Sequence, residues 1–512
     1  MTQPGDGKTN IVPQRSRVLA WSAVMALVLL PSLWEWKYAP ELDLDDRGQY
    51  LMHAEALAEG RPYTDIGYIY SHYSPKTGPR IAPPGAPLTL APILKISPHN
   101  QTPFKLLVLM SLVAFIGISG QYIARRFDVW LGIVTALITG IALQADVIPA
   151  FGLTDITFAA LVWAVIALAD SSRPWSMSRT TLITAVGIAA FLYRTAAVPL
   201  IPAVFLFGII QFREQRFRPL VPLLVWSAIF TLSYQVLKIG RIPPDPNGVV
   251  PSPVEFGGLP PDAGCCKSLI RLGREAWAYR EGVFNSHLYP FPWGSGNDLY
   301  HLASAGLMIV GLIYWLPRAR RQFLAMFALT YAAMLLLSPI GATRYLWPLF
   351  PVLAFAFLWG LRWAIGIAFP RLCASRATAL IASLLAVGAL ARQAASPAPG
   401  PLVSHPALQE LFRVVEDANA RSGMRVAFSK PRTLSWETGV PAMPLIVARP
   451  EMIFEELGRQ RITHVVMGSL GLQPWRTDFW RRFVADHPNR FQLEFRNPGF
   501  SLYRLVPVSE SP

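Results

Sequence analysis

The chain has few cysteines and few charged side chains. Its 512 residues include 3 cysteines, and charged residues make up only 15% of the composition. Cys265 and Cys266 are adjacent and Cys373 is distant, so there is no CxxC spacing and neither a disulfide framework nor a zinc site is expected. No GxxxxGK[ST] or GxGxxG loop occurs where a strand would lead into it. The sequence therefore excludes small disulfide-stapled folds and the common nucleotide-binding folds.

The sequence is instead rich in long apolar runs. Hydrophobic residues amount to 53% and the mean hydropathy is +0.36, above the range of soluble domains. Runs of roughly 17–22 apolar residues match the hydrocarbon thickness of a bilayer. They lie near residues 18–37, 104–123, 129–148, 154–170, 219–238, 299–316, 322–339, 345–364 and 377–395, with two shorter runs in 180–212 that meet near Arg194. The sequence predicts a polytopic α-helical membrane protein with about eleven transmembrane helices.

Basic residues predict the orientation. They occupy alternate short loops, which the positive-inside rule assigns to the cytoplasm: Lys8, Arg15, Arg17, Arg125, Arg126, Arg173, Arg179, Arg213, Arg216, Arg218, Arg318, Arg320, Arg321, Arg371 and Arg376. Residues 1–17 are then cytoplasmic, residues 18–395 form the membrane body, and loops 38–103 and 239–298 face outward with residues 396–512. No small-x-small cleavage site follows the first run, which predicts an uncleaved anchor. The net charge of +15 indicates topology and affinity for anionic lipids rather than nucleic acid, since no nucleic-acid motif occurs.

The last part of the chain differs in composition from the rest. A Ser/Pro/Ala-rich linker covers residues 394–401, and hydrophobic density falls beyond it. Helix-like stretches at 406–420, 450–460 and 476–486 alternate with strand-like ones at 425–428, 463–467, 491–495 and 502–506. Residues 396–512 are therefore predicted to form a small soluble α/β domain outside the membrane.

An acidic cluster follows the first apolar run directly. It contains Glu41, Asp43, Asp45 and Asp46 and opens an amphipathic stretch, 46–59, predicted to be a helix lying on the membrane. The apolar stripe of this helix is Tyr50, Leu51, Ala54, Leu57 and Ala58, and Gly60 with Pro62 ends it. Asp46 has two interpretations, a helix N-cap or a general base that deprotonates an acceptor. Asp43-Leu44-Asp45 also spells DxD, which leaves a divalent metal as an alternative although no cofactor is otherwise implied.

Four basic residues are candidates to bind a phosphate on the same side. Lys76 and Arg80 follow the acidic helix, Arg194 interrupts an apolar segment, and Arg344 opens one. Burial of a cation in a membrane costs roughly 2.5–3.5 kcal/mol or more without a partner, so such residues are functional candidates by default. Arginine also matches phosphate with a bidentate fork. Arg344 has a second interpretation, a side chain that reaches the outer interface.

These motifs together resemble a known family. Asp46-Arg47-Gly48-Gln49-Tyr50, followed by Pro83-Pro84-Gly85-Ala86-Pro87-Leu88, resembles the first outer loop of the GT-C integral-membrane glycosyltransferases. The narrower likeness is to protein O-mannosyltransferases and the lipid A aminoarabinose transferase. Leu153-Thr154-Asp155, Phe191-Leu192-Tyr193-Arg194-Thr195 and Arg344-Tyr345-Leu346-Trp347-Pro348 resemble later motifs of that family in the same order. Arg47 replaces the usual Glu and Ala82 the usual Lys.

The resemblance implies a glycosyltransferase that uses a polyprenyl-phosphate-linked sugar and an extracytoplasmic acceptor. It implies Asp46, with Asp45 beside it, as the catalytic acid pair. It further implies Lys76, Arg80, Arg194 and Arg344 at the donor phosphate and Tyr50, Asp155 and Tyr345 at the substrate; Asp155 is alternatively a helix N-cap. An O-antigen ligase or polymerase would share the membrane body without needing the acidic helix. A transporter or lipid flippase would show internal pseudo-symmetry, which the unequal outer loops and tail do not.

The topology leads to the first testable prediction. Cys265, Cys266 and cysteines engineered after residue 405 should react with an impermeant thiol reagent on intact cells, whereas Cys373 should not, because it lies in an arginine-rich loop. Gel-shift detection of the labelled protein measures this. Labelling of Cys373 without labelling of the tail would reverse the orientation.

Overall fold

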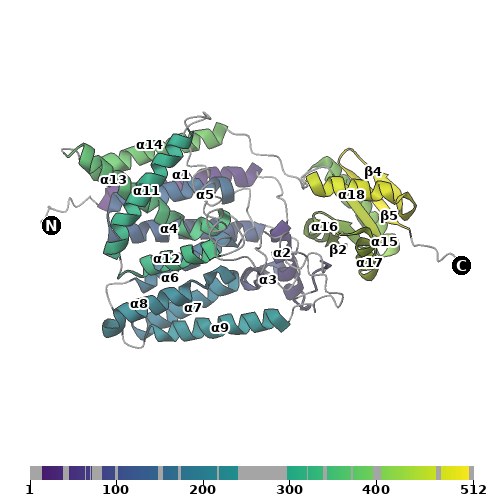
Figure 1. Ribbon diagram of the computed structural model, residues 1–512, viewed down its shortest axis with the longest axis horizontal. Coiled ribbons are helices and arrows are strands. Elements are labelled where there is room, and N and C mark those ends of the chain that lie inside the picture. The colour runs from purple at the N-terminus through teal and green to yellow at the C-terminus, as the bar shows by residue number, and fades with distance from the viewer. Residues whose placement is uncertain are drawn as a thin grey trace.

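The computed structural model describes residues 14–38, 45–63, 65–69, 71, 83–98, 102–147, 154–170, 174–215, 218–239, 297–319, 321–337, 343–370, 373–395, 405–468 and 474–506. A bundle of long helices forms one end of the molecule and an α/β domain forms the other (Figure 1). Two short helices, α2 (Asp45–Ala58) and α3 (Gly85–Ile96), lie at the end of the bundle that faces this domain.

The bundle helices coincide with the predicted apolar segments. They are α1 (Gln14–Tyr38), α4 (Thr102–Arg126), α5 (Val129–Val147), α6 (Asp155–Ala169), α7 (Met177–Tyr193), α8 (Leu200–Gln215), α9 (Leu220–Ile239), α11 (Asn297–Ala319), α12 (Phe323–Leu337), α13 (Phe350–Ala368) and α14 (Ala374–Ala395). The break predicted near Arg194 separates α7 from α8. Among the described residues, the helical stretches Thr102–Arg126 and Tyr345–Ala368 are long and apolar enough to cross a membrane, and the other apolar stretches are shorter. The number of crossings stays a prediction.

Glycines let some of these helices touch through their backbones. A Cβ on Gly311 of α11 would lie 1.8 Å from the carbonyl oxygen of Ala356 on α13. A Cβ on Gly360 of α13 would lie 1.9 Å from the carbonyl oxygen of Leu307 on α11. Small residues at such crossings are how helices associate where lipid removes the hydrophobic driving force. Any larger side chain at either position would push the two helices apart.

A polar cluster joins three helices where α6 ends. The carboxylate of Asp170 accepts hydrogen bonds from the Tyr122 hydroxyl and, at 3.2 Å, from the guanidinium of Arg126, both on α4. It also accepts the backbone N–H of Leu324, in the first turn of α12, at 3.4 Å. A buried carboxylate with an ionic partner and a helix N-terminus is electrostatically satisfied. Asp170 thereby ties α4, α6 and α12 together at one end of the bundle.

Helix α2 is more enclosed than a helix lying on a membrane. It begins at Asp45, so Asp46 lies within its first turn rather than at the predicted N-cap. The predicted apolar stripe is also incomplete: the polar Gln49 and His53 and the apolar Met52 and Ala56 are buried, whereas Leu57 and Ala58 are partly exposed. The cause is additional cover: α3 and a helix of the C-terminal domain both pack against α2, and the Tyr63 ring stacks on His53 with the ring centres 4.1 Å apart. Gly60 ends α2 with a φ of +74°, as its sequence position predicts.

The C-terminal domain is a five-stranded sheet with helices on both faces. Its strands are β1 (Val426–Phe428), β2 (Ala442–Pro444), β3 (His464–Gly468), β4 (Phe491–Arg496) and β5 (Phe500–Leu505), in the order β2-β1-β3-β5-β4. β1 pairs in parallel with β2 and β3, while β5 is antiparallel to β3 and β4. Helices α15 (Pro406–Ser422) and α16 (Pro431–Thr438) pack on one face, and α17 (Pro450–Arg459) and α18 (Pro474–Asp486) on the other. A 3₁₀ turn, η6 (Pro488–Arg490), precedes β4.

The predicted helices and strands of this domain are confirmed within a few residues. β2 and α16 were not predicted. β2 has only three residues, Ala-Met-Pro, and α16 only eight, too few for either to show a periodic pattern. Both take their shape from the partners they pack against.

The glycine contacts provide a stability prediction. Gly311→Ala should lower the free energy of unfolding by about 1–3 kcal/mol, because the new methyl group collides with backbone rather than with a movable side chain. Gly306→Ala, on the same helix but with open space around its Cβ, is the matched control and should be neutral or slightly stabilising. Thermal unfolding of the purified protein in detergent measures both. Equal unfolding temperatures for the two variants would contradict the close approach of α11 and α13.

Candidate active site

A hydrogen bond joins the acidic helix to the bundle. Tyr50 of α2 is buried, and its phenol oxygen accepts from the Thr154 hydroxyl at 3.4 Å. Thr154 immediately precedes α6, and Asp155 is the first residue of that helix. Asp46 lies four residues before Tyr50, in the first turn of α2. Tyr50 thereby joins α2 to the N-terminus of α6.

Arg194 occupies the extended gap between α7 and the 3₁₀ turn η2 (Thr195–Ala197). One terminal nitrogen of its guanidinium donates to the Asp155 carboxylate at 2.8 Å and to the Thr154 hydroxyl at 3.3 Å. The other donates to the phenol oxygen of Tyr345 at 3.1 Å, and the guanidinium carbon lies 5.0 Å from the centre of the Tyr345 ring. The side chains are 11% exposed for Arg194 and 2% for Asp155. A single cation thus joins three segments that are distant in sequence.

Tyr345 lies in a 3₁₀ turn, η5 (Thr343–Leu349), which leads into α13. The carbonyl of Tyr345 accepts from the Tyr331 hydroxyl at 3.0 Å, and the carbonyl of Pro348 accepts from the indole of Trp163 at 2.9 Å. These bonds from α12 and α6 hold the backbone of the turn in place. Arg344, the residue before Tyr345, is positioned with it.

The Pro-Pro-Gly-Ala-Pro segment packs against the residue before Arg194. A Cβ on Gly85 would lie 2.7 Å from the backbone of Leu192 and of Tyr193, so only glycine allows α3 to approach the end of α7 this closely. The hydroxyls of Thr89 and Tyr193 lie 2.8 Å apart and form a hydrogen bond. The motif recognised in the sequence therefore has a packing role, the support of the helix break at Arg194.

The structure brings four of the predicted site residues together: Tyr50, Asp155, Arg194 and Tyr345. The other predicted positions fall partly or wholly outside the described residues. The backbones of Asp45 and Asp46 lie in the first turn of α2 and that of Arg344 in η5, but their side chains lie outside, as do Lys76 and Arg80 altogether. Trp163 and Tyr331, which donate hydrogen bonds to the backbone of η5, were not predicted as site residues. Neither belongs to a motif, and only their indole and phenol groups in apolar helices hint that they need polar partners.

Asp155 is not free to act as a base in this arrangement, because its carboxylate is neutralised by Arg194 and lies at a helix N-terminus. Within the described residues no group of three or more His, Cys, Asp or Glu side chains is placed to bind a metal. The DxD residues Asp43 and Asp45 are not covered by that statement, since their side chains lie outside the described part.

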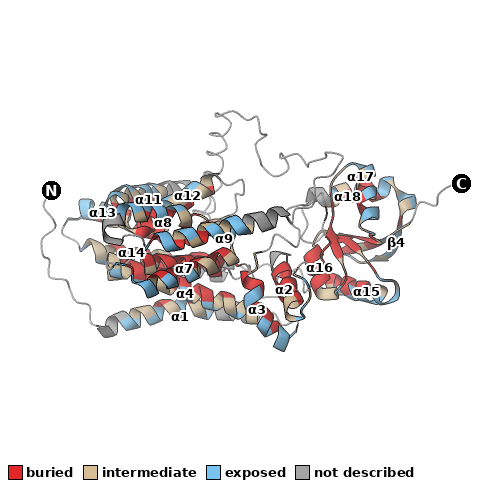
Figure 2. Ribbon diagram, turned by 90° about the horizontal axis from the view of Figure 1, so that it is seen from below, coloured by how far each residue is buried: buried red, intermediate tan, exposed pale blue. Residues whose placement is uncertain are grey.

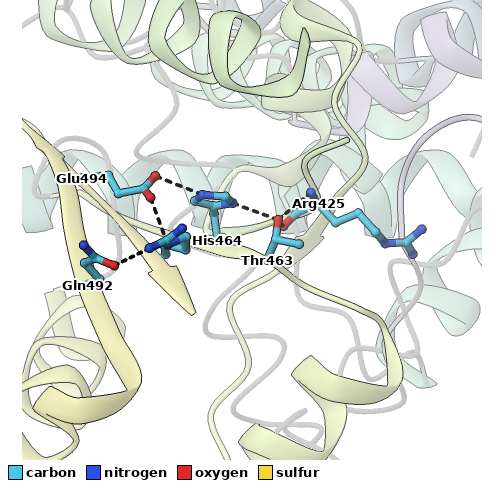
Figure 3. A network of polar contacts seen from close by, with 6 residues as sticks. Arg425, Thr463, His464, Gln492 and Glu494 are labelled. Atoms are coloured by element: carbon cyan, nitrogen blue, oxygen red, sulfur yellow. Dashed lines mark hydrogen bonds and ion pairs between the residues drawn. The ribbon is translucent and has the colours of Figure 1, made fainter. Parts of the chain in front are cut away.

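A separate polar network crosses the sheet of the C-terminal domain (Figure 3). His464 on β3 lies 3.1 Å from the Glu494 carboxylate and 2.8 Å from the Thr463 hydroxyl. Arg504 pairs with Glu494 at 3.2 Å and donates to Gln492 at 2.6 Å. Burial lowers the pKa of His464 below its ordinary value, an effect that Glu494 partly offsets. The Thr463 hydroxyl donates to the Arg425 carbonyl at 3.0 Å, and its oxygen accepts from the Arg425 backbone N–H at 3.0 Å. The network is therefore an internal brace of β3, β4 and β5.

The bundle of long apolar helices, the helix break at Arg194 and the α/β domain together form a fold similar to that of solved GT-C integral-membrane glycosyltransferases. The resemblance seen in the motifs is thereby confirmed at the level of the fold.

Three solved structures show this similarity. ArnT from Cupriavidus metallidurans in the apo state aligns with a TM-score of 0.54 and 15% identity over 96% of this chain and 98% of that one. The same protein bound to undecaprenyl phosphate aligns with a TM-score of 0.51 and 14% identity over 97% and 98%. The oligosaccharyltransferase of Archaeoglobus fulgidus with Zn and sulfate gives 0.55 and 13% over 96% and 74%. No protein-family model and no curated protein sequence matches the chain.

The network around Arg194 leads to a double-variant prediction. Arg194→Gln should lower the free energy of unfolding by about 3–5 kcal/mol, because it leaves the Asp155 carboxylate buried without a counter-charge. Arg194→Gln combined with Asp155→Asn removes both charges and should recover most of the loss. Thermal unfolding in detergent of the wild type, the single variants and the double variant measures these differences.

The control is Arg318→Gln, at an exposed arginine of α11, which should change the stability by no more than about 0.5 kcal/mol. If Arg194→Gln were as mild as this control, the ion pair would not organise the site.

Proposed function

We propose that the protein is a membrane glycosyltransferase that moves a sugar from a polyprenyl-phosphate-linked donor to an acceptor on the outer face of the cell membrane. The observation that carries the proposal is the convergence of α2, α6, α7 and η5 on Arg194, at the end of the bundle that faces the C-terminal domain. The fold shared with ArnT, whose structure includes undecaprenyl phosphate, supports a lipid-linked donor. The fold shared with an oligosaccharyltransferase tethered to an acceptor peptide supports an acceptor that binds the protein.

Asp46 is the proposed general base. It takes the proton from the acceptor hydroxyl or amine while the acceptor oxygen or nitrogen forms a bond to the anomeric carbon. The bond from that carbon to the phosphate oxygen breaks, and the lipid phosphate leaves with the electron pair. Attack from the side opposite the phosphate inverts the anomeric configuration. Asp45 precedes Asp46 at the start of α2 and is the second candidate acid.

The leaving phosphate must be stabilised by positive charge. The charge of Arg194 is partly neutralised by its ion pair with Asp155. We therefore divide the basic residues into two roles. Arg344, next to Tyr345 in η5, and Lys76 and Arg80, in the segment after α2, bind the phosphate directly. Arg194 holds Tyr345 and the start of α6, and so supports the turn that carries Arg344. Cations that are fixed before the reaction stabilise developing charge without reorganisation.

The membrane placement follows the arginine pattern. We propose a multi-pass protein of the plasma or inner membrane with the N-terminus in the cytoplasm and the C-terminal domain outside. The acids of α2 then lie near the outer interface, where a polyprenyl phosphate within the bilayer and a soluble or lipid-borne acceptor can meet.

Asp46→Asn is the decisive test. Asparagine cannot accept a proton, so the transfer rate should fall about a hundredfold or more. The loss of stability should stay within about 0.3–1 kcal/mol, since Asp46 lies in the first turn of α2 and asparagine forfeits only the charge–dipole interaction. Mass-spectrometric comparison of envelope glycans and lipids with and without the protein identifies the product. The rate is then measured with the purified protein and the corresponding undecaprenyl-phosphate sugar.

Asp43→Asn is the matched control from the same cluster and should keep most of the activity. Loss of activity in Asp45→Asn but not in Asp46→Asn would move the base by one residue. Full activity in all three variants would remove the glycosyltransferase proposal.

A further inference from the structure

The segment after α2 adds a strand to the sheet of the C-terminal domain. The backbone N–H of Ile69 donates to the carbonyl of Ala442 at 2.7 Å, and the N–H of Ala442 donates to the carbonyl of Gly67 at 3.1 Å. Tyr68 and Ala442 form a parallel bridge. Because β2 is the first strand of the sheet, residues 67–69 pair with an edge that would otherwise be open. Ile69 is also buried in the apolar cluster formed by the sheet, α17 and α18.

Helix α16 connects the same domain to α2 itself. Its residues 431–436 are all buried. Leu434 packs in the core of the C-terminal domain, whereas Trp436, only 5% exposed, packs in the apolar cluster that contains Tyr50 and Leu51 of α2. The guanidinium of Arg432 lies 5.5 Å from the centre of the Tyr68 ring. Figure 2 shows α16 facing α2, with buried residues on both.

Helix α2 depends on these contacts for its position. It has 14 residues, including Gly48, and an isolated helix of this length is marginal in water. One side of it meets the bundle through Tyr50, and the other side is covered by α16. The segment that leaves α2 is fixed in the sheet only a few residues after the helix ends at Ala58.

We infer that residues 67–69 and α16 form a clasp that positions α2 for the reaction, with Trp436 and Ala442 as positioning residues. Neither residue is placed at the substrate in the proposed mechanism. Their effect on the rate rests on the proposed function, whereas their effect on the order of α2 does not. The C-terminal domain thereby becomes part of the active-site scaffold.

Two variants open the clasp by different means. Ala442→Pro removes the backbone N–H of residue 442, which donates to the carbonyl of Gly67. This N–H points away from β1, so the pairing of β1 with β2 keeps its hydrogen bonds, and proline is tolerated at such a position of an edge strand. Trp436→Ala removes the side chain between α16 and α2. Leu411→Ala is the control, because it loosens the core of the domain, to which Leu434 and Ala442 also belong, while it keeps both the Ala442 N–H and the Trp436 side chain.

Hydrogen exchange of the full-length protein in detergent is the first measurement. Amides 51–58 of α2 should exchange about tenfold faster in both clasp variants, while those of β3 and β5 keep their rates. Leu411→Ala should show the reverse pattern. Unchanged exchange in α2 for both clasp variants would overturn the inference whether or not the protein proves to be a glycosyltransferase.

Transfer kinetics are the second measurement. Both clasp variants should lower kcat about tenfold or more with the donor KM within about twofold of wild type, because a displaced base slows the chemical step. Trp436→Phe, which keeps an aromatic ring in place, should restore most of kcat. An α2 that exchanges faster without any change in kcat would show that the clasp does not position the base. If wild type transfers no sugar, the proposed function fails while the exchange result still decides whether the clasp holds α2.

Discussion

The organisation of the site depends on the ion pair between Arg194 and Asp155. A guanidinium among apolar helices is tolerated only with a carboxylate beside it, and here the two charged groups are 2.8 Å apart. Their pairing requires α7 to end before Arg194 and α6 to begin at Asp155, and the remaining guanidinium nitrogen fixes Tyr345. Thr154 extends the same network to α2 through Tyr50. Four elements distant in sequence are thereby brought to one point.

Helix α6 carries a buried aspartate at each end, and the two have different tasks. Asp155 opens the helix and is part of the site, whereas Asp170 follows it and joins α4 to the first turn of α12. The helix between them is almost entirely apolar and packs in the core of the bundle. Polar contacts hold both ends of α6, and apolar packing holds the helix between them. Helix α6 therefore provides a fixed position for its partners, η5 through Trp163 and α2 through Thr154.

Local patterns account for the parts of this structure that were predicted. The apolar runs and the charge that interrupts one of them predict the bundle helices and the break at Arg194, since span length and the cost of a buried cation are local properties. The partners of Arg194 were not predictable, because Asp155 and Tyr345 meet it only through tertiary packing. β2, α16 and the added strand at Tyr68 were not predictable either, because each is stabilised by contacts with residues distant in sequence. The one-sided burial expected for α2 failed for that reason: α16 covers its other face.

The strand that Tyr68 contributes to the sheet also has a consequence for biogenesis. Its partner Ala442 is synthesised long after it, close to the end of the chain, and such non-local pairings form late in folding. During synthesis the helices of the bundle can insert and pack while α2 still lacks its outer cover. Enclosure of the acidic helix is then the last event of maturation, completed only when the C-terminal domain has folded. A stalled or prematurely terminated chain would reach the membrane without that enclosure, so complete synthesis is a condition for a finished site.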